Sequence, residues 1–592
     1  MNNYIKIILT AIVSVFTLNS CSLEEIIPDT ITPDKIKTED DVTSLIYGAY
    51  APLNNPDGFK YELFKYLFLA GDDIYANGVT ELQNISAKTF GAGDTQSFWN
   101  NFYSIIGNSN NLISVLDKLE LSNNFEKRAY GEAYFLRALS YYYLVRLYGG
   151  VPIRTVVTSI QSDFHMPRNT VDEVYNQIFE DLKKASENLP VRTKLTEAEI
   201  GRATKGAAFG ILAQAHITYA NHIERAGKRA EAEPHYQKTV DYCDSIINSG
   251  EYKLLDDFGK LFGVDNESVA YDEVLFAVRF AADAARSGFG ANGSEFAYRF
   301  HGGSSWHVTS DKPNGAGAAQ VRPQLWVTNV AYSGDYAPFP VSAPRPVYGQ
   351  TNYDYRAEVT FYQRGTRDAY NSTTKQFSIP IYMYPIQPEA LRSVIGHTAA
   401  TTGTIGKYTD ASGYDSRNHG NDFFIMRYAE IPILKAEALN ELNGPSQIAV
   451  DLFNELRVRA RKANGTARLY PTLLTLSAVN TKELFRKKIL DERLQEFHAE
   501  GQRWFDLVRM TSHTDPTKTM YDYQWEVFLP TQMAGTPSLN ANTNVWTIRG
   551  IINNATSVSA MTTYDPKFKL FPVPTSELIN NPKFGEQNPG WN

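Results

Sequence analysis

Apolar residues recur at helical spacing along most of the chain, in runs long enough to form pairs of packed helices. In the run over residues 123–148, the apolar positions from Ala129 to Leu147 repeat every three or four residues and mark one buried face. Asn123 and Glu126 predict a capping box at its start, and Gly149-Gly150 predict its end. The same periodicity predicts helices over 96–121, 171–188, 204–225, 234–249, 422–443, 447–463 and 480–510.

The segment from about Gly250 to His419 has a different pattern. It is rich in Gly, Ser, Thr, Asn and Pro, with short strand-like runs such as Val274–Phe280. A loop-rich insertion of this length usually carries function or closes a subdomain. We therefore expect a mainly α protein with a helical part over about 39–250 and a second part over 251–592, in which a loop-rich insertion (about 251–420) precedes closing helices.

The first twenty residues have the pattern of a signal peptide. Lys6 supplies a positive charge, and the apolar run from Ile7 to Leu18 is too short to span the ~30 Å hydrocarbon core of a bilayer. Leu18-Asn19-Ser20 leads into Cys21, which predicts cleavage at a lipoprotein site, acylation of Cys21 and a lipid-anchored tether over 21–38. The alternative is a secretory signal that happens to be cut beside a cysteine.

Composition narrows the function classes. The formal net charge is −8 without a Lys/Arg run, which argues against nucleic acid as a partner. Cys243 is the only other cysteine, so the mature chain has no disulfide framework. The 36 tyrosines suit stacking on sugar rings, although most aromatic rings in any protein serve packing.

Candidate catalytic and cofactor motifs are weak. Gly288 to Gly293 match a dinucleotide-binding loop, but no helix pattern follows, so we expect no cofactor. His301 and His307 lack clustered carboxylates or thiolates, so we expect no metal.

The adjacent Asp72 and Asp73 side chains diverge, whereas a glycosidase needs two facing carboxyls ~5–10 Å apart. We expect no enzyme, and a surface glycoside hydrolase remains the alternative.

Three glutamates, Glu492, Glu496 and Glu500, repeat at a spacing of four residues on one predicted helix. Like charges at this spacing repel each other unless they are paired. We expect them to form a structural ion-pair network with arginines of the preceding helix. The expected partners are Arg457, Arg459 and Arg461.

Five segments together resemble the SusD/RagB family of nutrient-uptake lipoproteins of Bacteroidota. They are residues 128–152, 201–208, 422–441, 491–509 and 570–591, and they occur in the family's order over nearly the whole chain. One departure is Pro432, where we expect a local kink or a helix start.

This resemblance implies a scaffold of tetratricopeptide-like helix pairs with a loop-rich, mixed second subdomain folded onto it. It also implies a lipid-anchored protein on the outer face of the outer membrane, where Glu24-Glu25 resemble the export signal. Such a protein binds a glycan and passes it to a SusC-like TonB-dependent transporter. A peptide or another nutrient as ligand, and a scaffold that binds only protein, stay open.

Because the family motifs belong to the scaffold, candidate ligand residues come from chemistry. A sugar site needs an aromatic platform beside amide, carboxylate or guanidinium groups. Three sets qualify, and for each residue packing is the competing interpretation. The first set is Asp72, Asp73, Tyr75 and Asn77; the second is Tyr298, Arg299, Trp306, His307, Arg322 and Trp326; the third is Trp99 and Asn101. Trp306 lies in a Gly/Ser-rich run that we interpret as a loop.

Overall fold

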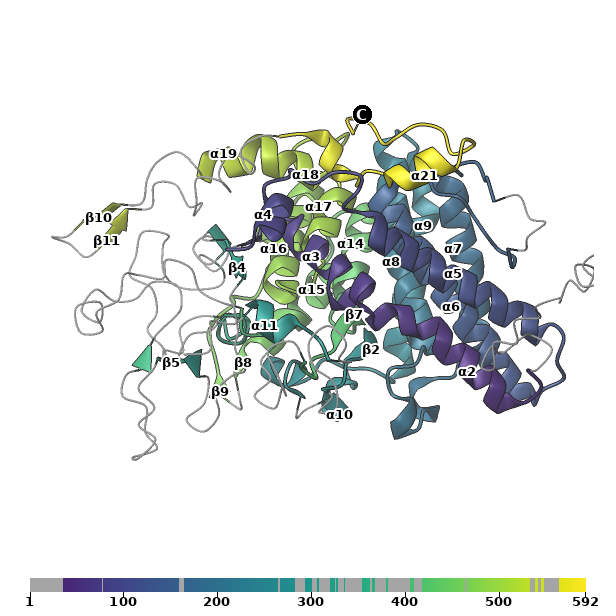
Figure 1. Ribbon diagram of the computed structural model, residues 1–592. Coiled ribbons are helices and arrows are strands. Elements are labelled where there is room, and N and C mark those ends of the chain that lie inside the picture. Colours follow the sequence, from purple (N-terminus) through teal and green to yellow (C-terminus); the bar gives the residue numbers. More distant parts are fainter. Residues whose placement is uncertain are drawn as a thin grey trace, which may run out of the picture.

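A computed structural model describes this protein. The described residues are 36–591, apart from 77, 159–163, 265–266, 283–292, 301–305, 308–319, 325, 328–334, 336–353, 362–364, 368–379, 382–404, 409–417, 464–465, 533–537, 541–544 and 548–563. The fold is mainly α, as predicted (Figure 1). Within the described residues, no helix combines the length and the hydropathy needed to cross a membrane. Cys21 lies outside them.

The N-terminal part is a stack of helices in which each helix packs against its neighbours in the sequence (Figure 1). They are α5 (Gln96–Leu116), α6 (Asn123–Tyr148), α7 (Val171–Asn188), α8 (Lys205–Arg225) and α9 (Arg229–Ser249), with α2 (Glu39–Tyr50) lying against α5 and α6. Glycines in α8 permit close approach. A Cβ on Gly206 would lie 2.4 Å from the Tyr252 ring, and one on Gly210 would lie 3.0 Å from Leu275.

At the starts of three helices, the cap or the first residue differs from the predicted one. The predicted Asn123–Glu126 capping box is wrong, because Ser122 is the N-cap of α6 and makes no side-chain cap bond. The helix predicted over 480–510 begins after its own N-cap, Thr481, whose side chain accepts a hydrogen bond from the Leu484 N–H. The α9 helix begins five residues before Pro234, the predicted start.

The C-terminal helices continue the stack, since α14 (Glu430–Asn443) packs against α9. They include α15 (Gln447–Ala460), α16 (Lys482–Phe497) and α17 (Arg503–Arg509). The predicted helix over 480–510 is broken, because Ala499 and Gly501 adopt φ values of +60° and +73°. Pro432 lies in the first turn of α14, in agreement with a helix start, since its missing N–H is not needed there.

The predicted helix over 422–443 begins instead with a strand. β7 (Phe423–Arg427) is buried along its whole length and pairs antiparallel with β2 (Val274–Val278). A strand buried on both faces is a continuous apolar run, which periodicity does not distinguish from a buried helix. Gly210 and Leu275 thus bring α8 against this two-stranded sheet.

Short elements join the two parts of the chain. β1 (Ile74–Ala76) pairs with β4 (Val321–Pro323), and the buried α3 (Glu62–Leu69) packs against α11 (Phe296–Phe300) through aromatic rings. The remaining short helices are α4 (Thr80–Ser86), α10 (Glu267–Ala270), α12 (Arg356–Thr360), α18 (Met520–Tyr523), α19 (Leu529–Gln532) and α21 (Thr575–Asn580). The other strands are β3 (Trp306–His307), β5 (Gly365–Arg367), β6 (Pro380–Ile381), β8 (Lys462–Ala463), β9 (Thr466–Ala467), β10 (Ser538–Asn540) and β11 (Val545–Thr547).

Candidate functional site

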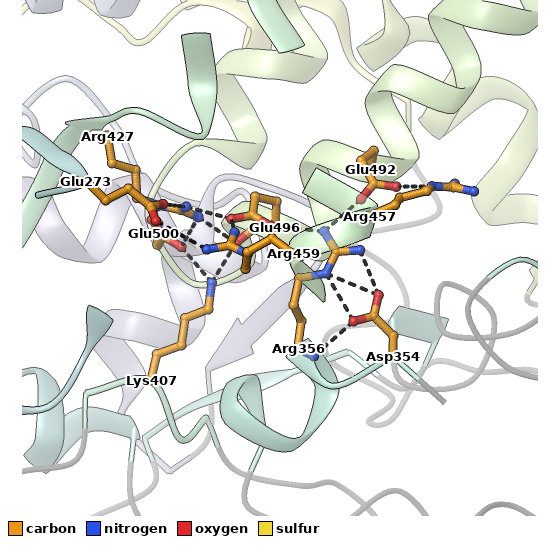
Figure 2. A network of polar contacts seen from close by, with 10 residues as sticks. All are labelled: Glu273, Asp354, Arg356, Lys407, Arg427, Arg457, Arg459, Glu492, Glu496 and Glu500. Carbon is orange, nitrogen blue, oxygen red and sulfur yellow. Dashed lines mark hydrogen bonds and ion pairs between the residues drawn. The ribbon is translucent and has the colours of Figure 1, made fainter. Parts of the chain in front are cut away.

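Among the described residues, a network of buried charged side chains surrounds α16 (Figure 2). Glu492 pairs with Arg457 at 2.8 Å and with Arg356 at 2.7 Å. Glu500 pairs with Arg427 at 2.8 Å and Lys407 at 2.6 Å. Between them, Glu496 pairs with three arginines: Arg356 at 3.0 Å, Arg427 at 2.6 Å, and Arg459. Asp354 and Glu273 complete the network on Arg356 and Arg427.

The network is electrostatically balanced, because each carboxylate meets at least one cation. Burial opposes ionisation of Glu496, but the guanidinium groups of Arg459, Arg427 and Arg356 outweigh it and hold the pKa of Glu496 well below its ordinary value. Burial lowers the pKa of Lys407 to about 8, against the attraction of Glu500. The carboxylates of this network are all buried against cations, so none of them is exposed for a substrate to reach.

The predicted pairing of the α16 glutamates with α15 arginines is confirmed for Arg457 and Arg459. It is wrong for Arg461, which follows the end of α15 and donates from Nε to the Arg468 carbonyl at 2.9 Å. The sequence did not reveal Arg356, Lys407 and Arg427, since they come from β7 and the loop-rich insertion. The network therefore fastens that insertion to α16.

Asp72, Asp73 and Trp326 form a buried junction that does not face solvent. Arg503 donates to both Asp72 carboxylate oxygens, at 2.7 and 3.0 Å. The Trp326 indole N–H donates to the Asp72 carbonyl at 2.7 Å, and Asp73 lies 3.0 Å from His498 Nδ1. The prediction that these three residues offer an exposed sugar-binding surface is wrong, because all three are buried: Asp72 against Arg503, Asp73 against His498, and Trp326 against Phe528.

Three more candidates serve packing. Tyr75 is buried in β1, opposite Arg322 of β4. The Trp99 ring packs edge-on against Tyr148 with centroids 4.8 Å apart. The Asn101 amide turns inward and donates to the Pro52 carbonyl at 2.9 Å. Asn77 lies outside the described residues.

Three remaining candidates, Tyr298, Arg299 and Arg322, lie on α11 and β4, which contact each other. With Tyr61, which precedes α3 and lies against Arg299, they form a surface that we call the tyrosine–arginine face. The Arg299 guanidinium carbon lies 4.5 Å from the centroid of the Tyr61 ring and 5.3 Å from that of Tyr298. Both tyrosines and Arg322 are half-buried, so each keeps part of its side chain in solvent. Arg299 itself is held by Glu295 at 2.5 Å.

Polar groups surround this face. The Tyr61 hydroxyl donates to Glu81 at 3.1 Å, and Arg299 also donates to Gln320. Burial raises the pKa of Tyr61 to about 12, which keeps the hydroxyl protonated and able to donate. Sequence reasoning missed Tyr61, Glu81 and Gln320, because Tyr61 and Glu81 lie more than 200 residues before Tyr298 and share no motif with it.

Trp306 and His307 belong to a strand and not to a loop. They form β3, with Trp306 opposite Arg367 and His307 opposite Thr366 of β5. Their side chains lie outside the described part of the chain. Within that part, no group of three or more His, Cys, Asp or Glu side chains could hold a metal ion.

Comparison with known proteins places the fold in a family. The profile of the SusD family matches residues 272–591, and a profile named "Starch-binding associating with outer membrane" matches residues 25–217. SusD-like protein P2 of Formosa agariphila is 27% identical, over 98% of this chain and 99% of its own.

Solved structures agree with this assignment. The crystal structure of a SusD homologue from Bacteroides thetaiotaomicron has a TM-score of 0.70 at 20% identity, covering 94% of this chain and 98% of the homologue. Surface glycan-binding protein A of the same species, solved with laminarihexaose, has a TM-score of 0.63 at 17% identity, covering 93% and 100%. This chain belongs to the SusD family.

Proposed function

We propose that this protein is an outer-membrane lipoprotein that binds a glycan at the cell surface and passes it to a SusC-like TonB-dependent transporter. The observation that carries the proposal is the tyrosine–arginine face, in a chain that matches SusD-like proteins along nearly its whole length. The similarity to a glycan-binding protein crystallised with laminarihexaose supports a glycan as the ligand.

The chemistry of the face suits a sugar. The solvent-facing part of the Tyr298 ring can stack on the apolar C–H face of a pyranose, beside the Tyr61 ring that Arg299 covers. Arg322 and Glu81 can respectively donate to and accept from its hydroxyl groups. Trp306 and His307, on β3 in the loop-rich part, stay proposed ligand residues because an aromatic ring and an imidazole there suit a sugar.

Binding without catalysis is part of the proposal. The glutamates of α16 are engaged by arginines and lysine, and Asp72 and Asp73 are engaged by Arg503 and His498. The lipid anchor on Cys21 and the outer-face location rest on the signal sequence and on the outer-membrane profile that matches residues 25–217.

The test is affinity electrophoresis of the mature chain in gels that contain laminarin, starch, xylan or mannan, together with a reducing-sugar assay. Retardation by at least one polysaccharide without release of reducing ends is the expected result. Tyr298→Ala should weaken binding by about tenfold, as expected when a stacking aromatic at an interface is removed. Tyr47→Ala is the matched control, because Tyr47 is 55% exposed on α2, away from the face.

Three other results would contradict the proposed function or its site. Release of reducing sugar would identify a hydrolase. No retardation by any polysaccharide, with co-purification of a membrane barrel, would favour a protein-binding scaffold. An equal loss of polysaccharide binding in Tyr298→Ala and Tyr47→Ala would show that the ligand does not bind at the tyrosine–arginine face.

A further inference from the structure

A second surface feature lies on the helical scaffold, between α5, the extended segment 152–158 after α6 together with Phe164, and α21. It is a cavity of about 310 Å³, which we call the α5 groove. The groove residues used below are Trp99, Asn100, Tyr103, Arg154, Phe164 and Glu577. In Figure 1, α5 and α21 lie to the right, whereas α11 and β4 of the tyrosine–arginine face lie to the left.

The α5 groove is preformed by polar contacts that fix its walls. The Tyr103 hydroxyl donates to the Pro152 carbonyl at 2.8 Å, and Asn110 donates to the carbonyls of Arg154 at 3.1 Å and Val156 at 3.2 Å. These bonds hold the extended segment at a set distance from α5. The largely buried Trp99 also lines the groove, and its ring is held edge-on by Tyr148. A site held in this way needs little reorganisation when a ligand binds.

The walls combine apolar surface with polar groups that have spare hydrogen-bonding capacity. Phe164 is 53% exposed, and Arg154 donates to its carbonyl at 2.7 Å. The exposed Asn100 side chain makes no hydrogen bond to the described residues. Glu577 accepts from Asn581 through Oε1 at 2.8 Å, which leaves Oε2 for a ligand.

Charge decides which ligand class fits. Glu577 and Arg154 act in opposite directions on the Tyr103 hydroxyl, whose pKa burial raises well above its ordinary value, so both charges lie close to the groove. An anionic ligand would meet Glu577, and a cationic ligand would meet Arg154. A purely apolar ligand would leave both charges and the Asn100 amide without partners, which costs free energy. A neutral molecule with many hydroxyl groups can donate to Glu577 and accept from Arg154 and Asn100.

We propose that the α5 groove is a second carbohydrate-binding site for neutral sugar units, separate from the tyrosine–arginine face. The inference rests on the proposed glycan-binding function. Volumes near 300 Å³ are at the small end of ligand sites, which suits one or two sugar rings. Two sites on one chain strengthen the binding of a long polysaccharide, because the second contact is made at a high effective concentration.

The test compares Asn100→Ala and Phe164→Ala with Asn108→Ala in the mature chain. Asn108 is an exposed asparagine on the same helix that is directed at Gly48 and not at the groove. Laminarin, starch, xylan and mannan serve as the polysaccharide probes. Asn100→Ala should weaken retention of a retained polysaccharide by about 3- to 10-fold, the effect of one or two lost hydrogen bonds, and Phe164→Ala by about tenfold. Asn108→Ala should match the wild type.

The combination of a groove variant with Tyr298→Ala separates this inference from the proposed function. Tyr298→Ala alone and each groove variant alone should still be retarded partly by the polysaccharide. The combined variant should no longer be retarded. If the groove variants retain polysaccharide as well as the wild type does, the second site is overturned and the proposed function stands. If the wild type retains no polysaccharide, both are overturned. Peptide binding can be measured with a casein digest. If the groove variants lose peptide binding but keep polysaccharide binding, the groove binds peptides and the proposal is overturned.

Discussion

Replacing Glu496 by Ala removes the central carboxylate of the network in Figure 2. Glu496 is fully buried and lies between Arg356, Arg427 and Arg459, which come from α12, β7 and α15. After the substitution, Arg459 keeps Glu273 at 3.3 Å, Arg427 keeps Glu273 and Glu500, and Arg356 keeps Asp354 and Glu492. The site then holds one excess buried positive charge.

The expected loss in the free energy of unfolding follows from this excess buried charge. Removing one partner of a buried ion pair costs about 3–5 kcal/mol, because the other charge stays desolvated without compensation. Each of the three arginines keeps another carboxylate, so we expect a loss of unfolding free energy within that range, about 3–5 kcal/mol. Domains are typically stable by only about 5–15 kcal/mol. The variant should fold but unfold at a clearly lower urea concentration.

The pH dependence gives a second signature. The pKa of Glu496 in the folded chain lies well below its ordinary value, so its carboxylate stabilises the fold above the unfolded pKa of about 4.3. That contribution is lost as the pH falls through the folded pKa. The stability difference between the wild type and Glu496→Ala should therefore be full at pH 7 and should shrink in strongly acidic buffer.

Urea unfolding followed by tryptophan fluorescence measures both effects. Glu231→Ala is the matched control, because Glu231 pairs with Lys228 at 3.2 Å on an exposed surface, where a pair contributes about 0–1 kcal/mol. A double-mutant cycle with Arg459→Ala should show a coupling of about 1–3 kcal/mol. Unchanged stability of Glu496→Ala together with lost glycan binding would refute the reasoning and make Glu496 a ligand residue.

Three further substitutions test other parts of the structure. Cys21→Ala should move the protein from the membrane fraction to the soluble fraction, and retention on membranes in cells without the transporter would contradict the lipid anchor. Trp326→Ala should cost about 3–5 kcal/mol of unfolding free energy, because the ring is buried and bonded to Asp72; a stable variant with weaker glycan binding would reverse that assignment. Burial lowers the pKa of His216 well below 6.5, so the fold loses stability as the pH falls below about 6.5; His216→Gln should make that decline shallower in urea titrations between pH 7 and 5.

The scaffold was predictable because helical periodicity is local information. The run over 171–188 matches α7 residue for residue, and the spacing of Glu492, Glu496 and Glu500 correctly indicated two arginine partners on the preceding helix, Arg457 and Arg459. The errors occurred where tertiary contacts decide. β7 is a strand because β2 lies beside it, and the 480–510 run breaks where residues near Ala499 and Gly501 turn back over Asp72 and Asp73.

The ligand candidates were less predictable, since an aromatic or acidic residue in a polar segment has the same local pattern whether it is covered or exposed. Asp72, Trp99 and Trp326 met the chemical criteria and proved to be buried. Sequence reasoning missed two residues that keep solvent exposure next to the candidates. They are Tyr61, beside Arg299, and Asn100, beside Trp99. Only the long-range contacts of the fold separate the two groups.

The buried network suggests how one scaffold can carry different ligand sites. It holds the loop-rich insertion at three places, through Glu273, through Asp354 and Arg356, and through Lys407, all of which join the α16 glutamates directly or through a shared arginine. A buried, hydrogen-bonded ion pair fixes position more strictly than an apolar contact, because its geometry is directional. Segments between fixed points can change length and sequence at little cost to the fold, since loop closure entropy grows slowly with length. Under the proposed function, Tyr298 and Arg299 lie in the segment between the Glu273 and Asp354 anchors, whereas the α16 motif belongs to the scaffold and carries no information about the glycan.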